Sequence, residues 1–275
     1  MLRCGGYVLP LDRPVVMGVL NGTPDSFSDG GRFAGPAQAI ERARRMADEG
    51  AALLDIGGES TRPGAAPVSE DEELSRVLPV LAGLHDLRLP ISVDTRRARV
   101  MREVLAAGAS MINDVNALRA PGALEAVAQS GCGLCLMHMQ GEPGTMQDAP
   151  AYGEVVAEVR DFLAARIGAA QAAGIARERL VADPGFGFGK TAAHNLLLLR
   201  RLSELSVLGV PLAAGWSRKS TLGVLTGREA GERLAASLAA ALLAAQAGAT
   251  ILRVHDVKET LDVLRVWQAV QEAGA

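Results

Sequence analysis

The sequence predicts an α/β protein with a single domain, a (β/α)8 TIM barrel over residues 1–275. Eight short apolar runs alternate along the chain with longer segments of helical pattern. The apolar runs are continuous, which is typical of parallel strands that helices cover on both faces. A chain of 275 residues can hold eight such units without dividing into domains. An open, doubly wound sheet is the alternative architecture, but it rarely contains eight strand–helix units.

Each expected strand ends in a polar residue. The strands are expected at residues 15–21, 53–59, 91–94, 111–114, 134–138, 180–183, 211–217 and 251–255. In a barrel the carboxyl ends of the strands meet at one mouth, where active sites are built. The polar residues at these ends therefore predict an active site at that mouth. They are Asn21, Glu59, Asp94, Asn113, Asp114, His138, Asp183, Ser217 and His255.

Helical patterns separate the expected strands. They cover residues 36–50, 70–83, 97–108, 121–131, 152–174, 192–202, 230–248 and 257–273. Glycine is the residue that most readily adopts the left-handed conformation of a helix C-cap, which we expect at Gly50, Gly108, Gly131, Gly174 and Gly248. Ser69, with Glu72 three residues later, has the pattern of a capping box at the start of the second helix.

Two strands are followed by long loops rich in Gly, Pro, Asp and Ser, at residues 22–35 and 60–69. Long loops in a compact domain are usually functional or disordered. Four of the five phenylalanines lie in glycine-rich loops, namely Phe27, Phe33, Phe186 and Phe188. Phenylalanines beside strand ends indicate either stacking on a flat ligand or anchoring of the loops, and both interpretations stay open.

Cations gather around the last two strands. Arg218 and Lys219 follow the seventh strand, and Arg253 lies near the end of the eighth. This part of a barrel commonly binds phosphate, to which Arg offers a two-pronged contact and Lys a point charge. These residues predict an anion site, with a solvated basic rim as the alternative.

Charge and cysteine content exclude several classes of protein. The formal net charge is -3 and the isoelectric point is near 5.9, which disfavours a nucleic-acid partner. No segment is typical of a signal peptide, and the Ala-rich segment 234–252 reads better as a buried helix and strand than as a membrane span. Three cysteines fit a reducing cytoplasm. Cys132 and Cys135 would point to opposite faces of a strand, so their spacing does not predict a metal or redox site.

Eight segments of the chain together resemble one known family. They read MGVLNGTPDSFSDGGRF, DIGGESTRPGA, SVDT, INDV, LMHMQG, DPGFGFGK, GWSRKS and RVHD. In their order and spacing, they resemble the dihydropteroate synthases over essentially the whole chain.

The resemblance implies a transferase of folate biosynthesis. In that reaction 6-hydroxymethyl-7,8-dihydropterin diphosphate condenses with p-aminobenzoate to give 7,8-dihydropteroate and pyrophosphate. The family's pathway is dissociative (SN1-like): pyrophosphate leaves with Mg2+, and the aniline captures a cationic pterin methylene. The resemblance also implies that the protein is a cytoplasmic homodimer and a target of sulfonamides. Its substrates would be small molecules, and neither a nucleic acid nor a membrane is expected as a partner.

The resemblance assigns roles to individual residues. The pterin is expected at Asp94, Asn113, Met137, Asp183 and Lys219. Pyrophosphate is expected at Asn21, Thr61, Arg62, Arg253, Val254 and His255, with Asn21 also a ligand of Mg2+. p-Aminobenzoate is expected at Phe27, Thr61, Pro63, Phe188, Ser217 and Lys219. The catalytic set comprises Asn21, Arg62, Asp94, Asp183, Lys219, Arg253 and His255.

Two other functions would use a similar barrel. The pterin-binding domain of a corrinoid methyltransferase shares the Asp and Asn contacts to the ring but has no evident use for a pyrophosphate pocket. A catalytically silent pterin-binding homologue would keep the fold and erode the two long loops, which here look intact. Both stay as alternatives to the synthase.

Overall fold

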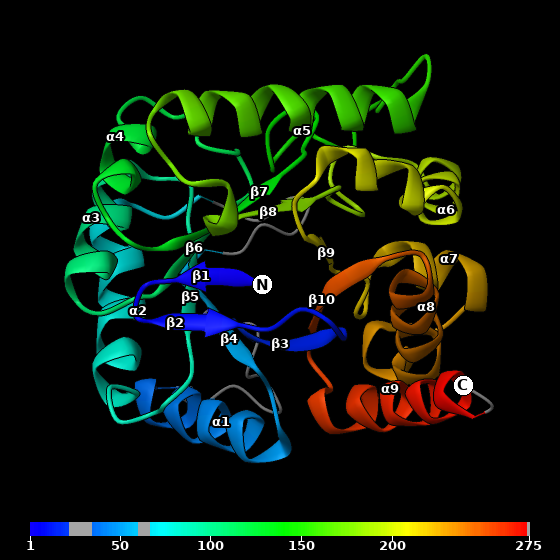
Figure 1. Ribbon diagram of the computed structural model, residues 1–275, viewed down its shortest axis with the longest axis horizontal. Helices are drawn as coiled ribbons and strands as arrows, with labels where there is room; N and C mark the ends of the chain where they lie inside the picture. The colour runs from blue at the N-terminus through cyan, green and yellow to red at the C-terminus, as the bar shows by residue number, and fades with distance from the viewer. Residues whose placement is uncertain (22–34, 60–66, 274–275) are drawn as a thin grey trace.

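The computed structural model describes residues 1–21, 35–59 and 67–273, and it confirms the barrel (Figure 1). Eight parallel strands close on themselves in the order β10-β3-β4-β5-β6-β7-β8-β9. The helices that connect them lie around the outside. Because β10 pairs with β3, the last strand of the chain completes the ring that an early strand begins.

Every expected strand is present. The barrel strands are β3 Val15–Asn21, β4 Leu53–Gly57, β5 Ile91–Asp94, β6 Met111–Asp114, β7 Gly133–Met137, β8 Leu180–Asp183, β9 Leu212–Ala214 and β10 Ala249–Val254. Four match their predicted bounds. The other four end before the polar residue that was expected to close them, so Glu59, His138, Ser217 and His255 lie just beyond strand ends.

The expected helices are present with small changes in their bounds. They are α1 Pro36–Glu49, α2 Glu70–Gly83, α3 Ala98–Ala106, α4 Ala123–Ala128, α5 Val155–Ala172, α6 Ala192–Arg200, α8 Leu234–Gln246 and α9 Val257–Glu272. The helix expected at 230–248 is divided into a short 3-10 turn, Ala230–Glu232, and α8. The helix α7, Ser220–Thr226, and the 3-10 segments Arg177–Arg179 and Leu202–Leu208 were not expected.

An N-terminal hairpin was also not expected. Its strands are β1 Leu2–Cys4 and β2 Tyr7–Leu9, which pair antiparallel around a turn where Gly5 has a φ of 59°. Leu2, Cys4 and Leu9 are buried in one apolar cluster with residues of the barrel strands. The hairpin lies across the middle of the barrel in Figure 1 and covers its apolar interior.

Alternate side chains of the strands belong to two separate apolar clusters. One cluster is formed by side chains of the helices and by strand side chains that point outward, and it lies between the helices and the barrel. Its strand members include Leu54, Ile112 and Leu252. The other contains the hairpin and the intervening strand residues, and it fills the interior. Its strand members include Met17, Leu53, Met111, Val181 and Ile251.

The interior changes from apolar to polar toward the carboxyl ends of the strands. On four strands, the interior residue that comes two positions after an apolar interior residue is polar. These polar residues are Asp55, Asn113, Asp183 and Arg253. Side chains two apart on a strand point to the same face, so these polar groups lie above the apolar layer. The period of the strands thus places ionisable side chains inside the mouth.

The predicted capping box at α2 is half formed. Ser69 Oγ accepts a hydrogen bond from the Glu72 backbone N–H at 3.1 Å, whereas the Glu72 carboxylate pairs with Arg76 instead of returning to the cap. A reciprocal box is found at α6, between Thr191 and His194. Within the described residues, no helix has the length and apolar character needed to cross a bilayer.

Candidate active site

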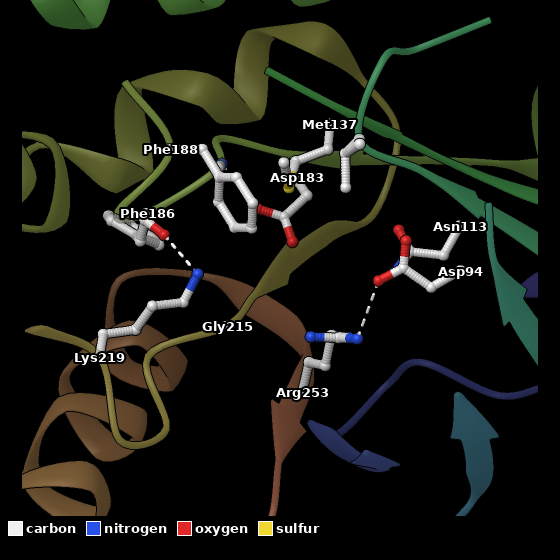
Figure 2. Close-up of a pocket in the computed structure, with 11 residues that line it drawn as sticks. Asp94, Asn113, Met137, Asp183, Phe186, Phe188, Gly215, Lys219 and Arg253 are labelled. Carbon is white, nitrogen blue, oxygen red and sulfur yellow. Dashed lines mark hydrogen bonds and ion pairs between the residues drawn. The ribbon is translucent and has the colours of Figure 1, made fainter. Parts of the chain in front are cut away.

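A pocket opens at the carboxyl ends of the barrel strands (Figure 2). Its walls come from five strands and from the segments that follow β6, β8 and β9. The lining residues are Asp94, Asn113, Val115, Met137, Asp183, Gly185, Phe186, Phe188, Gly215, Lys219 and Arg253. All five residues predicted to hold a pterin are therefore in this one pocket.

Asp183 is a buried carboxylate at the end of β8. It is 5% exposed, and its Oδ1 accepts a hydrogen bond from the Gly185 backbone N–H at 2.7 Å. Burial raises the pKa of Asp183, and the charges of Lys219 and Arg253 oppose that rise. A carboxylate held in this way can accept two parallel N–H donors from a flat ring.

Arg253 connects two carboxylates inside the mouth. Its Nε donates to Asp55 Oδ2 at 2.6 Å, and its Nη2 donates to Asp94 Oδ2 at 3.1 Å. Burial raises the pKa of Asp94 to about 8; Arg253 lowers it and the nearby charge of Asp55 raises it. The cation expected to hold an anion therefore lies directly against the acidic wall in this structure (Figure 2).

Lys219 stands on the other side of the pocket. Its Nζ donates to the Phe186 carbonyl oxygen at 2.6 Å and lies 4.0 Å from the centre of the Phe188 ring. Desolvation lowers the pKa of Lys219 to about 7. An ammonium over an aromatic face, next to Asp183, can contact both a polar ring and a neighbouring aromatic ligand.

The two phenylalanines of the loop after β8 have different roles. Phe186 is almost fully buried and packs on Trp216, with ring centres 4.7 Å apart. Phe188 faces the pocket beside Lys219. Phe186 therefore anchors the loop, while stacking of Phe188 on a flat ligand stays a prediction.

The loop after β8 is held by close backbone packing and by one buried lysine. Gly185 has a φ of +69°, and a Cβ there would lie 1.9 Å from the His138 carbonyl oxygen. Lys190 Nζ donates to the carbonyl oxygens of Gly185 and Phe188 at 2.9 and 3.0 Å, and lies 2.9 Å from His138 Nδ1. These contacts fix the short span between Asp183 and Phe188.

The expected anion site keeps two of its three cations. Arg253 and Lys219 line the pocket, but Arg218 pairs with Asp256 through an ion pair of 2.6 Å. Arg218 is not among the residues that line the pocket, and Asp256, just after β10, holds its guanidinium. Ser217 Oγ lies 2.9 Å from His255 Nδ1, so this predicted p-aminobenzoate residue stands beside a predicted pyrophosphate residue.

Several polar strand ends serve the fold and not the pocket. Glu59 pairs with Arg97 at 2.8 Å, and Asp114 accepts hydrogen bonds from the Asn116 and Leu118 backbone N–H groups. His138 Nδ1 lies 2.9 Å from Lys190 Nζ. The expectation that every polar strand end belongs to the site was therefore wrong for these three.

The remaining predicted residues are placed only in part. Asn21 ends β3, beside Gly57 of β4, at the same end of the barrel as the pocket. Val254 is buried among the apolar side chains outside the barrel, which leaves only its backbone for a ligand. Phe27, Thr61, Arg62 and Pro63 lie outside the described residues.

Asp55 was not predicted from the sequence. This carboxylate is fully buried in β4 and joins two pocket residues, Asn113 and Arg253. The signal was a single acidic residue inside an otherwise apolar strand, at an interior position two residues after Leu53.

Comparison with known proteins gives a consistent match. The model of the family described as pterin binding enzyme matches residues 17–255. The dihydropteroate synthase of Escherichia coli strain K12 is 51% identical over 269 residues, covering 98% of this chain and 95% of that protein. The dihydropteroate synthase of Xanthomonas albilineans, solved with 4-aminobenzoic acid, superposes with a TM-score of 0.92 at 57% identity, covering 98% and 97%. The Yersinia pestis enzyme, solved as a sulfonamide drug complex, gives 0.94 at 50% identity, with 98% of each chain covered.

Proposed function

The chain belongs to the dihydropteroate synthases, within the pterin-binding enzymes, and we propose that its barrel mouth joins the two substrates by ionisation before capture. The enzyme is a transferase of folate biosynthesis that forms dihydropteroate. The observation that carries the proposed mechanism is the pocket itself, which brings Asp94, Asn113 and Asp183 into one cavity with Lys219 and Arg253.

The acidic wall suits the pterin ring. Asp183 can accept hydrogen bonds from the ring's 2-amino group and its N3–H, and Asn113 and Asp94 complete the contacts to the ring edge. Met137 lines the same cavity and can pack on the ring face. A buried carboxylate favours positive charge that develops on the ring as the leaving group departs, so Asp183 stabilises the transition state more than the bound substrate.

The leaving diphosphate belongs at the side of the mouth formed by β3 and β10. Arg253 and His255 come from β10 and the residue after it, and Asn21 ends the adjacent β3. When the diphosphate binds, Arg253 can exchange its contact with Asp94 for phosphate oxygens while Nε stays on Asp55. That exchange would free Asp94 for the pterin.

We propose that a magnesium ion carried by the diphosphate is held by Asn21, whose side chain lies outside the described part of the structure. No group of three or more His, Cys, Asp or Glu side chains among the described residues could hold a metal by itself. One amide oxygen from Asn21, with phosphate oxygens and water, is a typical set for Mg2+. The ion would supply charge neutralisation of the leaving diphosphate, and this chain would supply Asn21 as its protein ligand.

p-Aminobenzoate belongs beside Phe188 and Lys219, in contact with both. The ring of Phe188 offers a stacking face, and the Lys219 ammonium lies above it. Ser217, Phe27, Thr61, Arg62 and Pro63 complete the proposed pocket. An aniline nitrogen is already nucleophilic, so no general base is needed, and catalysis consists of ionisation and positioning. Sulfonamides, which share the aminophenyl group, would compete for the same place.

We also propose that two copies of the chain associate through α8 and α9. An apolar groove runs between these helices, lined by Leu242, Gln246, Asp262, Val263, Val266, Trp267, Val270 and Gln271. Val266 and Val270 are 68% and 64% exposed. Leu243 on the neighbouring helix is 53% exposed and extends the apolar surface. A contiguous apolar patch of this kind is typical of a protein interface, and an identical copy would bring its own apolar patch to it.

The three cysteines support a cytoplasmic setting. Cys4, Cys132 and Cys135 are all buried and unpaired. Burial raises the pKa of the Cys135 thiol well above its ordinary value, which keeps it protonated. Unpaired thiols persist where the surroundings are reducing.

The decisive experiment mixes purified protein, Mg2+, the dihydropterin diphosphate and p-aminobenzoate, and measures pyrophosphate release with each component omitted in turn. Release should require the pterin diphosphate and Mg2+, and dihydropteroate should require all components. A chelator should abolish turnover while leaving the binding of free pterin intact. Pterin binding without pyrophosphate release would favour the silent homologue, and methyl transfer to a corrinoid would favour the methyltransferase domain.

A further inference from the structure

Asp55 lies in the wall of the barrel behind the pocket. It does not line the pocket, and its side chain is fully buried. Its Oδ2 accepts two hydrogen bonds, from Asn113 Nδ2 at 3.0 Å and from Arg253 Nε at 2.6 Å. Both donors belong to residues that do line the pocket. Asp55 therefore acts on a ligand only through other side chains.

The contact with Asp55 decides which end of the Asn113 amide faces the pocket. A carboxylate oxygen can only accept, so at this distance the amide must present its NH2 group to Asp55. The amide oxygen must then point the other way. Asn113 Oδ1 is buried and accepts no hydrogen bond from any residue that the structure describes. A buried acceptor without a partner is costly unless a ligand supplies a donor.

The same carboxylate holds Arg253 independently of Asp94. The guanidinium has one hydrogen bond to each acid, through Nε to Asp55 and through Nη2 to Asp94. Asp55 has no exposed surface, whereas Asp94 lines the pocket and can turn to a ligand. Asp55 thus keeps the guanidinium in place when Asp94 leaves it.

We propose that Asp55 is a positioning residue that fixes Asn113 as a hydrogen-bond acceptor for a ring N–H of the pterin and retains Arg253 at the mouth. The inference rests on the proposed function, because it names the polarity of a contact in the pterin site. It specifies that the ring must present a donor to Asn113. A flat ligand with a bare ring nitrogen at that edge would meet an oxygen lone pair and be rejected.

The test compares three variants for affinity toward 6-hydroxymethyl-7,8-dihydropterin by calorimetry. Asp55→Ala removes the acceptor and should weaken binding by about tenfold to hundredfold. Asp55→Asn keeps an oxygen where Oδ2 stands, so Asn113 keeps its orientation and affinity should stay within about threefold. Ser92→Ala is the matched control: Ser92 is buried beside Asp55 on β5, and its hydroxyl bonds to no described residue.

The outcomes separate the possible explanations. Unchanged affinity in folded Asp55→Ala would overturn the proposal. Equal losses in the Ala and Asn variants would also overturn it, because the charge would then matter and not the acceptor. If the wild-type protein itself fails to bind the pterin, the proposed function fails, and the variants are not needed to show it.

A second measurement keeps the proposal testable if Asp55→Ala does not fold. Asn113→Asp alone should bind the pterin poorly, since two carboxylates would face each other. Adding Asp55→Asn removes one of the two facing charges and should recover affinity by at least about tenfold over the single variant. Additive losses in the double variant would contradict the proposed coupling.

Discussion

Two ionisable groups in the pocket have pKa values that burial moves toward neutrality. The pKa of Asp94 is raised to about 8, and that of Lys219 is lowered to about 7. Each group can therefore change its protonation when an anionic ligand arrives, at a small cost in free energy. Burial also raises the pKa of Asp183, and the Gly185 N–H and the charges of Lys219, Arg253 and Lys190 oppose that rise.

Asp183→Asn should weaken pterin binding by about 2–4 kcal/mol, because the amide puts a donor where the ring also presents one. Calorimetry with the free dihydropterin measures this loss. Asp114→Asn is the control, since Asp114 is as deeply buried but bonds backbone N–H groups outside the pocket. Equal affinity in wild type and Asp183→Asn would remove this carboxylate from the ring contacts.

His138→Gln should make the fold less sensitive to acid. Burial and then the charge of Lys190 lower the pKa of His138 to about 3 in the folded protein, from an ordinary value of 6.5. Below about pH 6.5, His138 is protonated in the unfolded chain but stays neutral in the folded chain. The free energy of unfolding therefore decreases as the pH falls toward 3. Between pH 7 and pH 5 the wild type should lose about 1–2 kcal/mol more than the variant.

Urea unfolding at the two pH values measures that difference. His85→Gln is the control, because His85 is exposed after α2 and makes no contact with the barrel mouth. Parallel losses of stability in the wild type and His138→Gln would show that His138 is not the acid-sensitive group.

Among single residues, the sequence predicted the side chains that line the pocket well, but it predicted the partners of charged side chains around the pocket poorly. Asp94, Asn113 and Asp183 were found because each lies at, or one residue before, the end of a strand. Asp55 was missed because a strand buried on both faces reads as one apolar run, and a run does not show which side chains face inward. The ion pair of Arg218 was not predicted, because its partner, Asp256, follows a different strand.

At the scale of elements, length decided what the sequence could reveal. The barrel strands and long helices were predicted because an apolar run or a helical period extends over enough residues. The hairpin strands have three residues each and α7 has seven, so neither shows a period. Their positions depend on contacts with distant segments, such as the hydrogen bond from the Gly5 N–H to the Gly131 carbonyl oxygen.

Ser69→Ala should destabilise the protein by about 1 kcal/mol, because it removes the side-chain cap of α2. Urea unfolding measures the change. Ser69→Thr retains the hydroxyl acceptor and should stay close to the wild type. A loss of the same size in both variants would indicate that the hydroxyl contributes nothing as a cap.

At the scale of the whole molecule, the barrel separates stability from chemistry. Apolar layers lie between the strands and the helices and under the N-terminal hairpin, while ionisable groups gather at the opposite mouth. The fold class followed from the sequence because this division repeats in every strand–helix unit. The contacts of Arg253 could not be predicted from the sequence, since they join residues up to 198 positions apart.

Val266→Glu should convert the proposed dimer to a monomer, because it places a charge in the apolar groove between α8 and α9. Sedimentation velocity measures the change in mass. Val224→Glu is the matched control: this valine is 73% exposed on α7, outside the groove. A wild-type protein that sediments as a monomer at micromolar concentration would contradict the dimer.

The pairing of β10 with β3 has a consequence for synthesis on the ribosome. Until residues 249–254 have emerged, β3 has no partner on one side, and its backbone donors and acceptors are open to another chain. A nascent or truncated polypeptide is thus an incomplete ring prone to self-association. The ring closes only when residues 249–254 are available to pair with β3.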